Sequence, residues 1–427
     1  VTHRTDSPTC LFTNLRLLIS AVVCKRWKIH SLDIKCAFLQ GKEIDRDIYV
    51  KPPREFDNGH IWKLNRTVYG LKDASRAWYL RVKEELIQLG AQISHYDEAL
   101  FLWYENSELV GVMSTHVDDF FWSGDSKFEM KVIQNLKQKF KISQEESMTF
   151  KYLGLNLSQQ NAEINISQND YIESVESIKL STNRKLEKDD SLTSTELRDL
   201  RALLGKLNWI ARQTRPDLSF DICSVSVNIK KATVKDILYA NKIVQKLHND
   251  NINIIMSSIG DISKCKIVSF QDASFANLPD KGSQGGYIIF LQGENKKIIP
   301  ITWQSRKVRR IVRSTIAAET LSLLDSIEEC FYIKSIMKDI LKIDNDQLLP
   351  IICYTDNKSL YNSVYSTKTV TDKRLLIDIS IIREMIDRQE IFQIEWIEGG
   401  HQISDCLTKY GASSSNLLRV IKGEQLF

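Results

Sequence analysis

The sequence contains no long apolar run, no paired cysteine spacing and no secretory leader. The most apolar early stretch, Leu17 to Cys24, is flanked by Arg16, Lys25 and Arg26 and is too short to cross a bilayer, so we expect a buried helix and no membrane partner. The eight cysteines lack the short paired spacing of zinc sites, which indicates reduced thiols in or near the core of an intracellular protein.

The chain also lacks an initiator methionine, internal repeats and low-complexity tracts. Because it starts at Val1, we expect it to be a piece of a longer translation product. Its 427 residues, 43% hydrophobic and 26% charged, are enough for two to three globular domains. The net charge of +4 permits a polyanionic partner but does not by itself indicate one.

Two adjacent aspartates, Asp118 and Asp119, lie between apolar, strand-forming runs. These runs predict a hairpin with both acids at its tip, although a polar surface turn is the alternative. A third acid, Asp33, begins a similar apolar stretch and could lie beside the tip. Three neighbouring carboxylates repel one another, so a divalent cation would stabilise them.

Hydrophobic periodicity divides the chain into three expected domains. Residues 1–165 alternate helices and strands, including a helix that starts near Gly70 and a strand over 150–157. Residues 166–260 are expected to be helical, apart from a polar, mobile stretch over 181–194. Residues 262–427 combine three antiparallel strands with alternating helices and strands.

A second set of acids lies in the last of these domains. Asp272 and Asp356 are expected at the ends of strands, and Asp405 follows in a loop. Glu319 falls on the apolar face of a predicted helix, where it either meets a partner or reaches out to water. Each acid is a weak signal alone, but four in one domain suggest a site.

Carboxylate-only sites suit Mg²⁺ or Mn²⁺ rather than Zn²⁺. Two such ions held roughly 3.5–4 Å apart support the phosphodiester chemistry of polymerases and nucleases. A basic run before the Glu319 helix would contact backbone phosphates, with a solvated basic face as the alternative. Its cationic residues are Arg306, Lys307, Arg309, Arg310 and Arg313.

Over nearly its whole length, the chain resembles the reverse transcriptase and ribonuclease H of copia-type long-terminal-repeat retrotransposons. Five motifs carry the resemblance in the first two domains: Leu32–Gly41, Tyr69–Tyr79, Val117–Asp119, Tyr152–Gly154 and Thr214–Asp217. Four carry it in the third domain: Asp272–Ser274, Ala317–Glu319, Tyr354–Asn357 and Asp405–Lys409. The resemblance implies an α+β palm-like polymerase core with a helical thumb, followed by a mixed α/β ribonuclease H-like domain.

The resemblance also implies residue roles in polymerisation. Asp33 and Asp118 would bind two catalytic metals, with Asp119 as the third acid, and Phe38 would exclude a 2′-hydroxyl. The remaining implied contacts are nucleotide binding by Lys72, Asp73 and Arg76, and primer binding by Tyr152 and Gly154.

In the last domain, the resemblance assigns metal binding and RNA cleavage to Asp272, Glu319, Asp356 and Asp405. The implied partners are an RNA template, a DNA primer, an RNA–DNA hybrid and deoxynucleoside triphosphates (dNTPs). The implied location is intracellular, in a cytoplasmic particle or the nucleus.

The chain departs from the family pattern at His116, where Tyr is usual, and at Asp73, where Gln is usual. An acid near a triphosphate would weaken nucleotide binding. His401 is four residues before Asp405 and is interpreted as a loop histidine. The fingers segment that normally precedes the region at Val1 is expected to be missing.

Three hypotheses follow. The first is an RNA-directed DNA polymerase with ribonuclease H activity. The second is a truncated or decayed copy that binds nucleic acid with little or no polymerase activity. The third is an interaction protein that a host has adopted for its shape.

Overall fold

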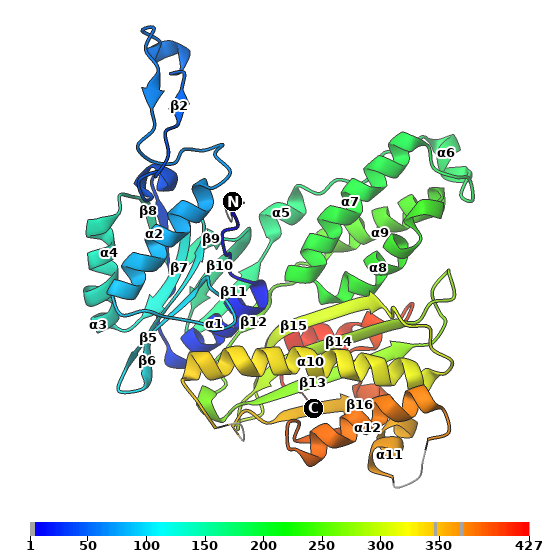
Figure 1. The fold of residues 1–427 in the computed structure, drawn as a ribbon. Coiled ribbons are helices and arrows are strands. Elements are labelled where there is room, and N and C mark those ends of the chain that lie inside the picture. The colour runs from blue at the N-terminus through cyan, green and yellow to red at the C-terminus, as the bar shows by residue number, and fades with distance from the viewer. Residues whose placement is uncertain (1–4, 346–347, 367–369, 427) are drawn as a thin grey trace. The chain divides into compact units, whose positions relative to one another are not determined.

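The computed structural model describes residues 5–345, 348–366 and 370–426, and it divides into two compact units (Figure 1). Unit 1 comprises Val1–Leu18, Lys25–Leu153 and Ile336–Lys342, and unit 2 comprises Ile19–Cys24, Gly154–Ser335 and Ile343–Phe427. The finer division at 1–165, 166–260 and 262–427 stays a prediction. Among the described residues, no helix combines the length and apolarity that a membrane crossing requires.

Unit 1 is built on a six-stranded antiparallel sheet in the order β4-β5-β6-β7-β1-β8. Its apolar face buries Leu32, Phe120 and Trp122 against helical residues such as Trp78 and Phe128. The strands are β1 (His30–Ile34), β4 (Gln92–Ile93), β5 (Leu100–Glu105), β6 (Glu108–His116), β7 (Asp119–Gly124) and β8 (Ile142–Ser147).

Two helical segments supply the other side of this core. Helix α2 (Ala74–Gln88) ends before Gly90, whose φ of +91° suits glycine and confirms the predicted end of the helix. The segment Ser126–Lys139 is helical throughout, with α3 (Ser126–Phe128) and α4 (Gln134–Lys139) joined by the π-helical turn η3 (Glu129–Ile133).

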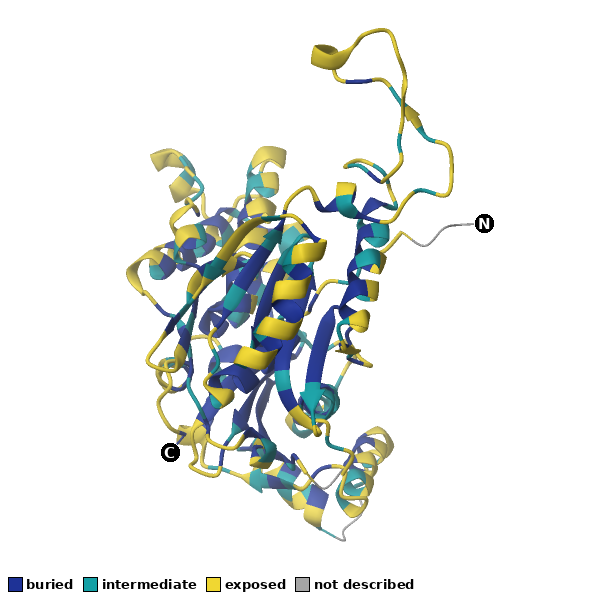
Figure 2. Cartoon of the chain, turned by 90° about the vertical axis from the view of Figure 1, so that its left-hand side faces the viewer, coloured by how far each residue is buried: buried dark blue, intermediate teal, exposed yellow. Residues whose placement is uncertain are grey.

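A largely exposed ribbon extends from unit 1 (Figure 2). It contains the short antiparallel strands β2 (Tyr49–Val50) and β3 (Trp62–Lys63), with the turn η2 (Arg54–Phe56) between them. Near the start of the chain, α1 spans Phe12–Lys25 and contains the stretch from Leu17 to Cys24 that was expected to form a buried helix.

The single strand expected over 150–157 is wrong. The chain forms β9 (Thr149–Tyr152) and then β10 (Leu155–Gln160), with a turn at Leu153 and Gly154 between them. Both turn residues have positive φ, 51° and 72°, which an extended strand cannot accommodate.

Unit 2 begins with an antiparallel arrangement of β10, β11 (Glu163–Ser167) and β12 (Ile254–Met256). The region 166–260, expected to be helical, also contains the last two residues of β11 and the whole of β12. The helices that follow are α5 (Asn169–Glu173), α6 (Thr182–Leu186), α7 (Ser194–Gln213), α8 (Ser219–Val227) and α9 (Val234–Asn249).

The rest of unit 2 is a five-stranded mixed sheet in the order β15-β14-β13-β16-β17. Strands β13 (Lys266–Ser274), β14 (Gln284–Gln292) and β15 (Ile298–Lys307) are antiparallel, whereas β16 (Ile351–Thr355) and β17 (Gln393–Trp396) continue the sheet in parallel. The helices that accompany this sheet are α10 (Thr315–Leu341), of which the part from Ile336 is assigned to unit 1, α11 (Lys358–Tyr365), α12 (Lys373–Asp387) and α13 (Ser415–Ile421). Helix α10 lies along one face of this sheet (Figure 1).

Short 3₁₀ turns complete the fold. They are η1 (Ala37–Gln40) in unit 1 and η4 (Pro216–Leu218), η5 (Ile229–Lys231), η6 (Ile262–Lys264), η7 (Gly399–His401) and η8 (Asp405–Leu407) in unit 2. The cysteines are unpaired, and most are buried as expected, but Cys36 is exposed.

Candidate active sites

The first acid set lies where the β6–β7 hairpin meets β1. Asp33 on β1 and Asp119 on β7 are partners in the antiparallel register. The predicted hairpin is present, and His116 pairs with Asp119 across it, so Val117 and Asp118 form a two-residue turn. Asp119 begins β7 rather than lying at the tip with Asp118, where the sequence predicts it. Strand pairing thus brings Asp33 and Asp119 side by side, with Asp118 next to them.

The turn is held in a strained conformation. Val117 has a φ of 56°, which is unfavourable for a β-branched side chain. The indole Nε1 of Trp78 donates to the Val117 carbonyl at 2.6 Å, and the Ile34 amide donates to the Asp118 carbonyl at 2.9 Å. Helix α2 and strand β1 therefore fix the backbone that carries the acids.

Burial and the neighbouring acids both favour the protonated form of Asp119. Burial, followed by the charges of Asp33, Asp118 and Glu146, raises the pKa of Asp119 to about 6. The Ser143 hydroxyl donates to Asp33 Oδ2 and orients that carboxylate. Such a hard, oxygen-only donor set fits Mg²⁺ or Mn²⁺.

Two aromatic rings lie beside the first acid set. Phe38, in η1, packs against Tyr69 with ring centroids 4.5 Å apart. The Tyr69 hydroxyl donates to Asp118 Oδ2 at 3.5 Å, and Tyr69 is largely exposed. Sequence reasoning missed Tyr69 as a site residue, although it opens the motif that continues through Gly70 and Leu71.

The three predicted nucleotide-binding residues lie around the start of α2. Lys72 is exposed, and Asp73 precedes the first residue of the helix. The Arg76 guanidinium donates to the Asp6 carbonyl at 3.1 Å. Arg46, which sequence reasoning missed because it is 27 residues from Asp73, forms a two-pronged ion pair with the Asp73 carboxylate.

Direct primer contact by Tyr152 is wrong for this conformation. Its side chain is fully buried, and its hydroxyl lies 3.0 Å from the Ser114 hydroxyl. Tyr152 is therefore a core residue behind the hairpin. Gly154 is exposed in the following turn, and its predicted contact stays a prediction.

The second acid set forms around neighbouring parallel strands of unit 2. Phe270 on β13 pairs with Tyr354 on β16, so extending the register by two residues places Asp272 opposite Asp356. One carboxylate oxygen from each of these acids and one from Asp405, at the start of η8, all lie within 4.8 Å of one another. Among the described residues, the first acid set does not converge as closely.

One detail of the second set differs from expectation, and the two alternatives left open for Glu319 are resolved. Asp272 lies within β13 rather than after its end, because the strand continues to Ser274. Glu319, on α10, is 4% exposed, so it does not reach water. Burial and then the charges of Asp272 and Asp356 raise the pKa of Glu319 well above its usual value.

The buried oxygens fit a bound metal. No hydrogen-bond donor in the described part of the chain reaches Glu319 Oε2, which is buried. A buried carboxylate oxygen without a donor is costly, and a cation would compensate it. The donors are all carboxylates, which again suits Mg²⁺ or Mn²⁺.

Two residues that sequence reasoning left without a role complete this cluster. The Thr408 hydroxyl donates to Asp272 Oδ2. The Lys409 ammonium lies 3.2 Å from Asp272 Oδ1 and 2.6 Å from Asp405 Oδ1. Both residues belong to the motif Asp405–Lys409, which was the available signal.

The predicted basic run has acidic neighbours within unit 2. Arg306 pairs with Asp325, Lys307 with Asp280, and Arg310 with Asp378. Arg309 and Arg313 are exposed. Partly exposed ion pairs are weak and can exchange partners, so phosphate contact by this run stays a prediction.

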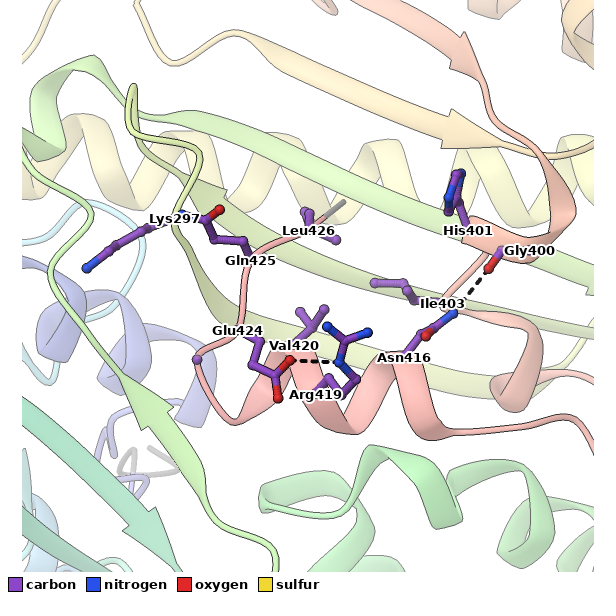
Figure 3. Close-up of a pocket in the computed structure, with 11 residues that line it drawn as sticks. Lys297, Gly400, His401, Ile403, Asn416, Arg419, Val420, Glu424, Gln425 and Leu426 are labelled. Atoms are coloured by element: carbon purple, nitrogen blue, oxygen red, sulfur yellow. Dashed lines mark hydrogen bonds and ion pairs between the residues drawn. The ribbon is translucent and has the colours of Figure 1, made fainter.

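His401 lies in the exposed turn η7, as expected for a loop histidine. It lines a pocket of about 840 Å³ with the end of the chain (Figure 3). Across this pocket, Asn416 donates to the Gly400 carbonyl at 3.1 Å, and Arg419 pairs with Glu424 at 2.7 Å.

Comparisons with known proteins bear on both units. Residues 2–187 match the family profile described as "Reverse transcriptase (RNA-dependent DNA polymerase)". The chain is 27% identical over 428 residues to the "Retrovirus-related Pol polyprotein from transposon RE1" of Arabidopsis thaliana, covering 95% of this chain and 28% of that protein. It is 23% identical to the "Retrovirus-related Pol polyprotein from transposon TNT 1-94" of Nicotiana tabacum, covering 94% of this chain and 31% of that protein.

Among solved structures, the foamy viral protease-reverse transcriptase in complex with RNA/DNA hybrid is similar with a TM-score of 0.49 and 13% identity. That match covers 87% of this chain and 44% of the other.

The predicted resemblance is confirmed as a similarity: residues 2–187 match the reverse transcriptase profile, and most of the chain is similar to retrovirus-related Pol polyproteins of transposons. Along the chain, an α+β region on a six-stranded antiparallel sheet, a run of helices and a mixed α/β region on a five-stranded sheet follow in the order of the predicted fold class. The chain spans about 28% of the length of the RE1 relative.

Proposed function

We propose that the chain is an RNA-directed DNA polymerase with ribonuclease H activity, acting through divalent metals at two sites. The observation that carries the proposal is the presence of two separate carboxylate sets, one in each compact unit. The first set would extend a DNA primer on an RNA template with dNTPs. The second would cut the RNA strand of the resulting hybrid.

At the first site, Asp33, Asp118 and Asp119 would hold Mg²⁺ or Mn²⁺, which when bound activates the attacking oxygen and stabilises the leaving one. The residues of the chain provide positioning. Trp78 and Ile34 fix the turn that carries the acids.

The Phe38 and Tyr69 rings form an aromatic pair beside the acids. A ring at Phe38 would crowd the 2′ position of a bound sugar and favour deoxynucleotides. Tyr69 would keep the Asp118 carboxylate oriented until substrate binds, because its hydroxyl reaches that oxygen.

At the second site, Asp272, Glu319, Asp356 and Asp405 would hold the metal. Asp272 and Glu319 are buried, whereas Asp356 and Asp405 are partly exposed and would be the ligands nearest to substrate. The Thr408 hydroxyl orients Asp272. This division into buried and accessible ligands suits cleavage of a bound polyanion.

The test is a pair of Mg²⁺-dependent assays on the chain, primer extension on an RNA template and RNA cleavage in a hybrid. Asp118→Asn is expected to abolish extension and leave RNA cleavage, and Asp356→Asn is expected to abolish cleavage. RNA cleavage that persists in Asp356→Asn would contradict the assignment of the second site.

The second candidate is a copy that binds nucleic acid with little or no polymerase activity. The acid cluster of unit 2 converges more closely than that of unit 1, which favours cleavage over synthesis in this conformation. Hybrid cleavage without primer extension by the unmodified chain would support this candidate over the first.

A further inference from the structure

Lys409 is the cation at the centre of the second acid set. Its ammonium lies between Asp272 and Asp405, at 3.2 Å and 2.6 Å from one oxygen of each. Asp272, Asp356 and Asp405 each offer one carboxylate oxygen within 4.8 Å of the others, so a metal held by this set would bind two of the carboxylates with which Lys409 pairs. The side chain and a divalent ion would therefore compete for the same carboxylates.

We propose that Lys409 is a tethered counter-ion, which holds the acid cluster together without metal and must be displaced when a divalent cation binds. This inference rests on the proposed metal site and adds a residue that controls metal affinity there. The Lys409 side chain is 39% exposed, so its end can move into solvent on its flexible four-carbon stem.

Charge balance supports displacement rather than joint occupancy. A divalent ion bound to Asp272 and Asp405 would place two positive groups within contact distance of the same oxygens, and like charges repel strongly where water is excluded. Without metal, the same ammonium offsets the repulsion between Asp272 and Asp405, with which it forms ion pairs. Metal binding therefore includes the free energy of breaking two ion pairs, which lowers the apparent affinity.

Unit 2 contains a matched control for this effect. The Lys246 ammonium lies 3.2 Å from Asp217 Oδ2, and the side chains of Lys246 and Asp217 are 39% and 0% exposed. The corresponding exposures for Lys409 and Asp272 are 39% and 1% at the same distance. Asp217 is neutralised by Arg215 and lies outside the acid cluster.

The experiment measures Mn²⁺ affinity by titration calorimetry in the Asp118→Asn chain, in which binding at the first set is suppressed. Adding Lys409→Met is expected to tighten Mn²⁺ binding by roughly tenfold, because the competitor is gone. It is also expected to lower Tm in EDTA, with Tm recovering on addition of Mn²⁺. Adding Lys246→Met is expected to leave Mn²⁺ affinity unchanged.

Two further variants make the result decisive. Lys409→Arg keeps the positive charge and should keep the weaker Mn²⁺ affinity, and Lys409→Gln provides a second neutral side chain that should behave like Lys409→Met. A neutral variant that folds only with Mn²⁺ would also support the proposal.

Unchanged or weaker Mn²⁺ binding in both neutral variants would overturn the role of Lys409, as would an equal gain in Lys246→Met. The proposed function fails in a different way. If the second acid set binds no metal, adding Asp356→Asn to the Asp118→Asn chain would not reduce Mn²⁺ binding. That result would contradict both the proposed metal site and the role of Lys409.

Discussion

The Arg46 guanidinium pairs with both carboxylate oxygens of Asp73: Nη2 lies 2.8 Å from Oδ1, and Nη1 lies 2.8 Å from Oδ2. This pairing offsets the charge that an acid at Asp73 would otherwise present to a triphosphate. Parallel, two-pronged geometry is among the stronger arrangements for a partly exposed ion pair. The chain thus has an acid at Asp73, where the family pattern has Gln, and Arg46 offsets the charge of that acid.

Removing Arg46 should therefore impair nucleotide binding more than removing Asp73. We expect Arg46→Ala to raise the KM for dNTPs about threefold, as an exposed pair of this kind contributes modestly. In an Asp73→Gln chain, Arg46→Ala should have a smaller effect. Steady-state primer extension with all four chains measures this coupling, and strictly additive effects would argue against it.

The raised pKa of Asp119 predicts how the stability of the metal-free protein changes with pH. Its carboxyl pKa is about 6 in the folded chain against an ordinary value of 3.8, so the folded state binds the extra proton between these pH values. The contribution of Asp119 to stability is therefore present at low pH and lost as the pH rises through 6. In EDTA, Asp119→Asn should raise Tm at pH 8 and change it little at pH 4.

The same shift predicts weaker metal binding in acid. A protonated Asp119 is a poor metal ligand, so primer extension at limiting Mg²⁺ should fall as the pH drops below about 6. Raising the Mg²⁺ concentration should partly restore activity at that pH. An acid loss that Mg²⁺ does not reverse would point to another group.

Glu319 should behave as a neutral acid in the absence of metal, since burial and its acidic neighbours raise its pKa well above the ordinary value. Glu319→Gln should then alter the free energy of unfolding in EDTA by less than about 1 kcal/mol, because an amide replaces a protonated carboxyl of similar shape. RNA cleavage should nevertheless be lost, since an amide is a poorer metal ligand. A large loss of stability in EDTA would show that Glu319 is ionised there.

A substitution at Tyr152 tests whether this residue belongs to the core or contacts the primer. Tyr152→Phe removes the hydroxyl that contacts Ser114 and leaves a buried polar partner, so unfolding in urea should show a loss of about 1 kcal/mol. Affinity for a primer–template duplex should stay within about twofold, because the side chain is not at the surface. A large change in affinity with unchanged stability would restore the direct role.

The acids could be predicted from the sequence because each follows or interrupts an apolar segment, where a carboxylate is costly to bury unless a cation or a hydrogen-bond donor meets it. Arg46 and Lys409 could not, because their roles depend on ion pairs whose geometry the strand pattern does not encode. The break at Leu153 was missed for a different reason. A leucine in the left-handed region is rare, so an apolar run through it reads as continuous strand.

The register between β13 and β16 has a consequence for how the second site tolerates change. Hydrogen-bonded neighbouring strands lie about 4.8 Å apart. Extending the β13–β16 register places Asp272 and Asp356 opposite each other, so the spacing of the two strands sets the distance between these two acids. Insertions in the connections between these strands would leave that spacing intact, whereas a slip of one residue in the pairing would move one acid to the opposite face.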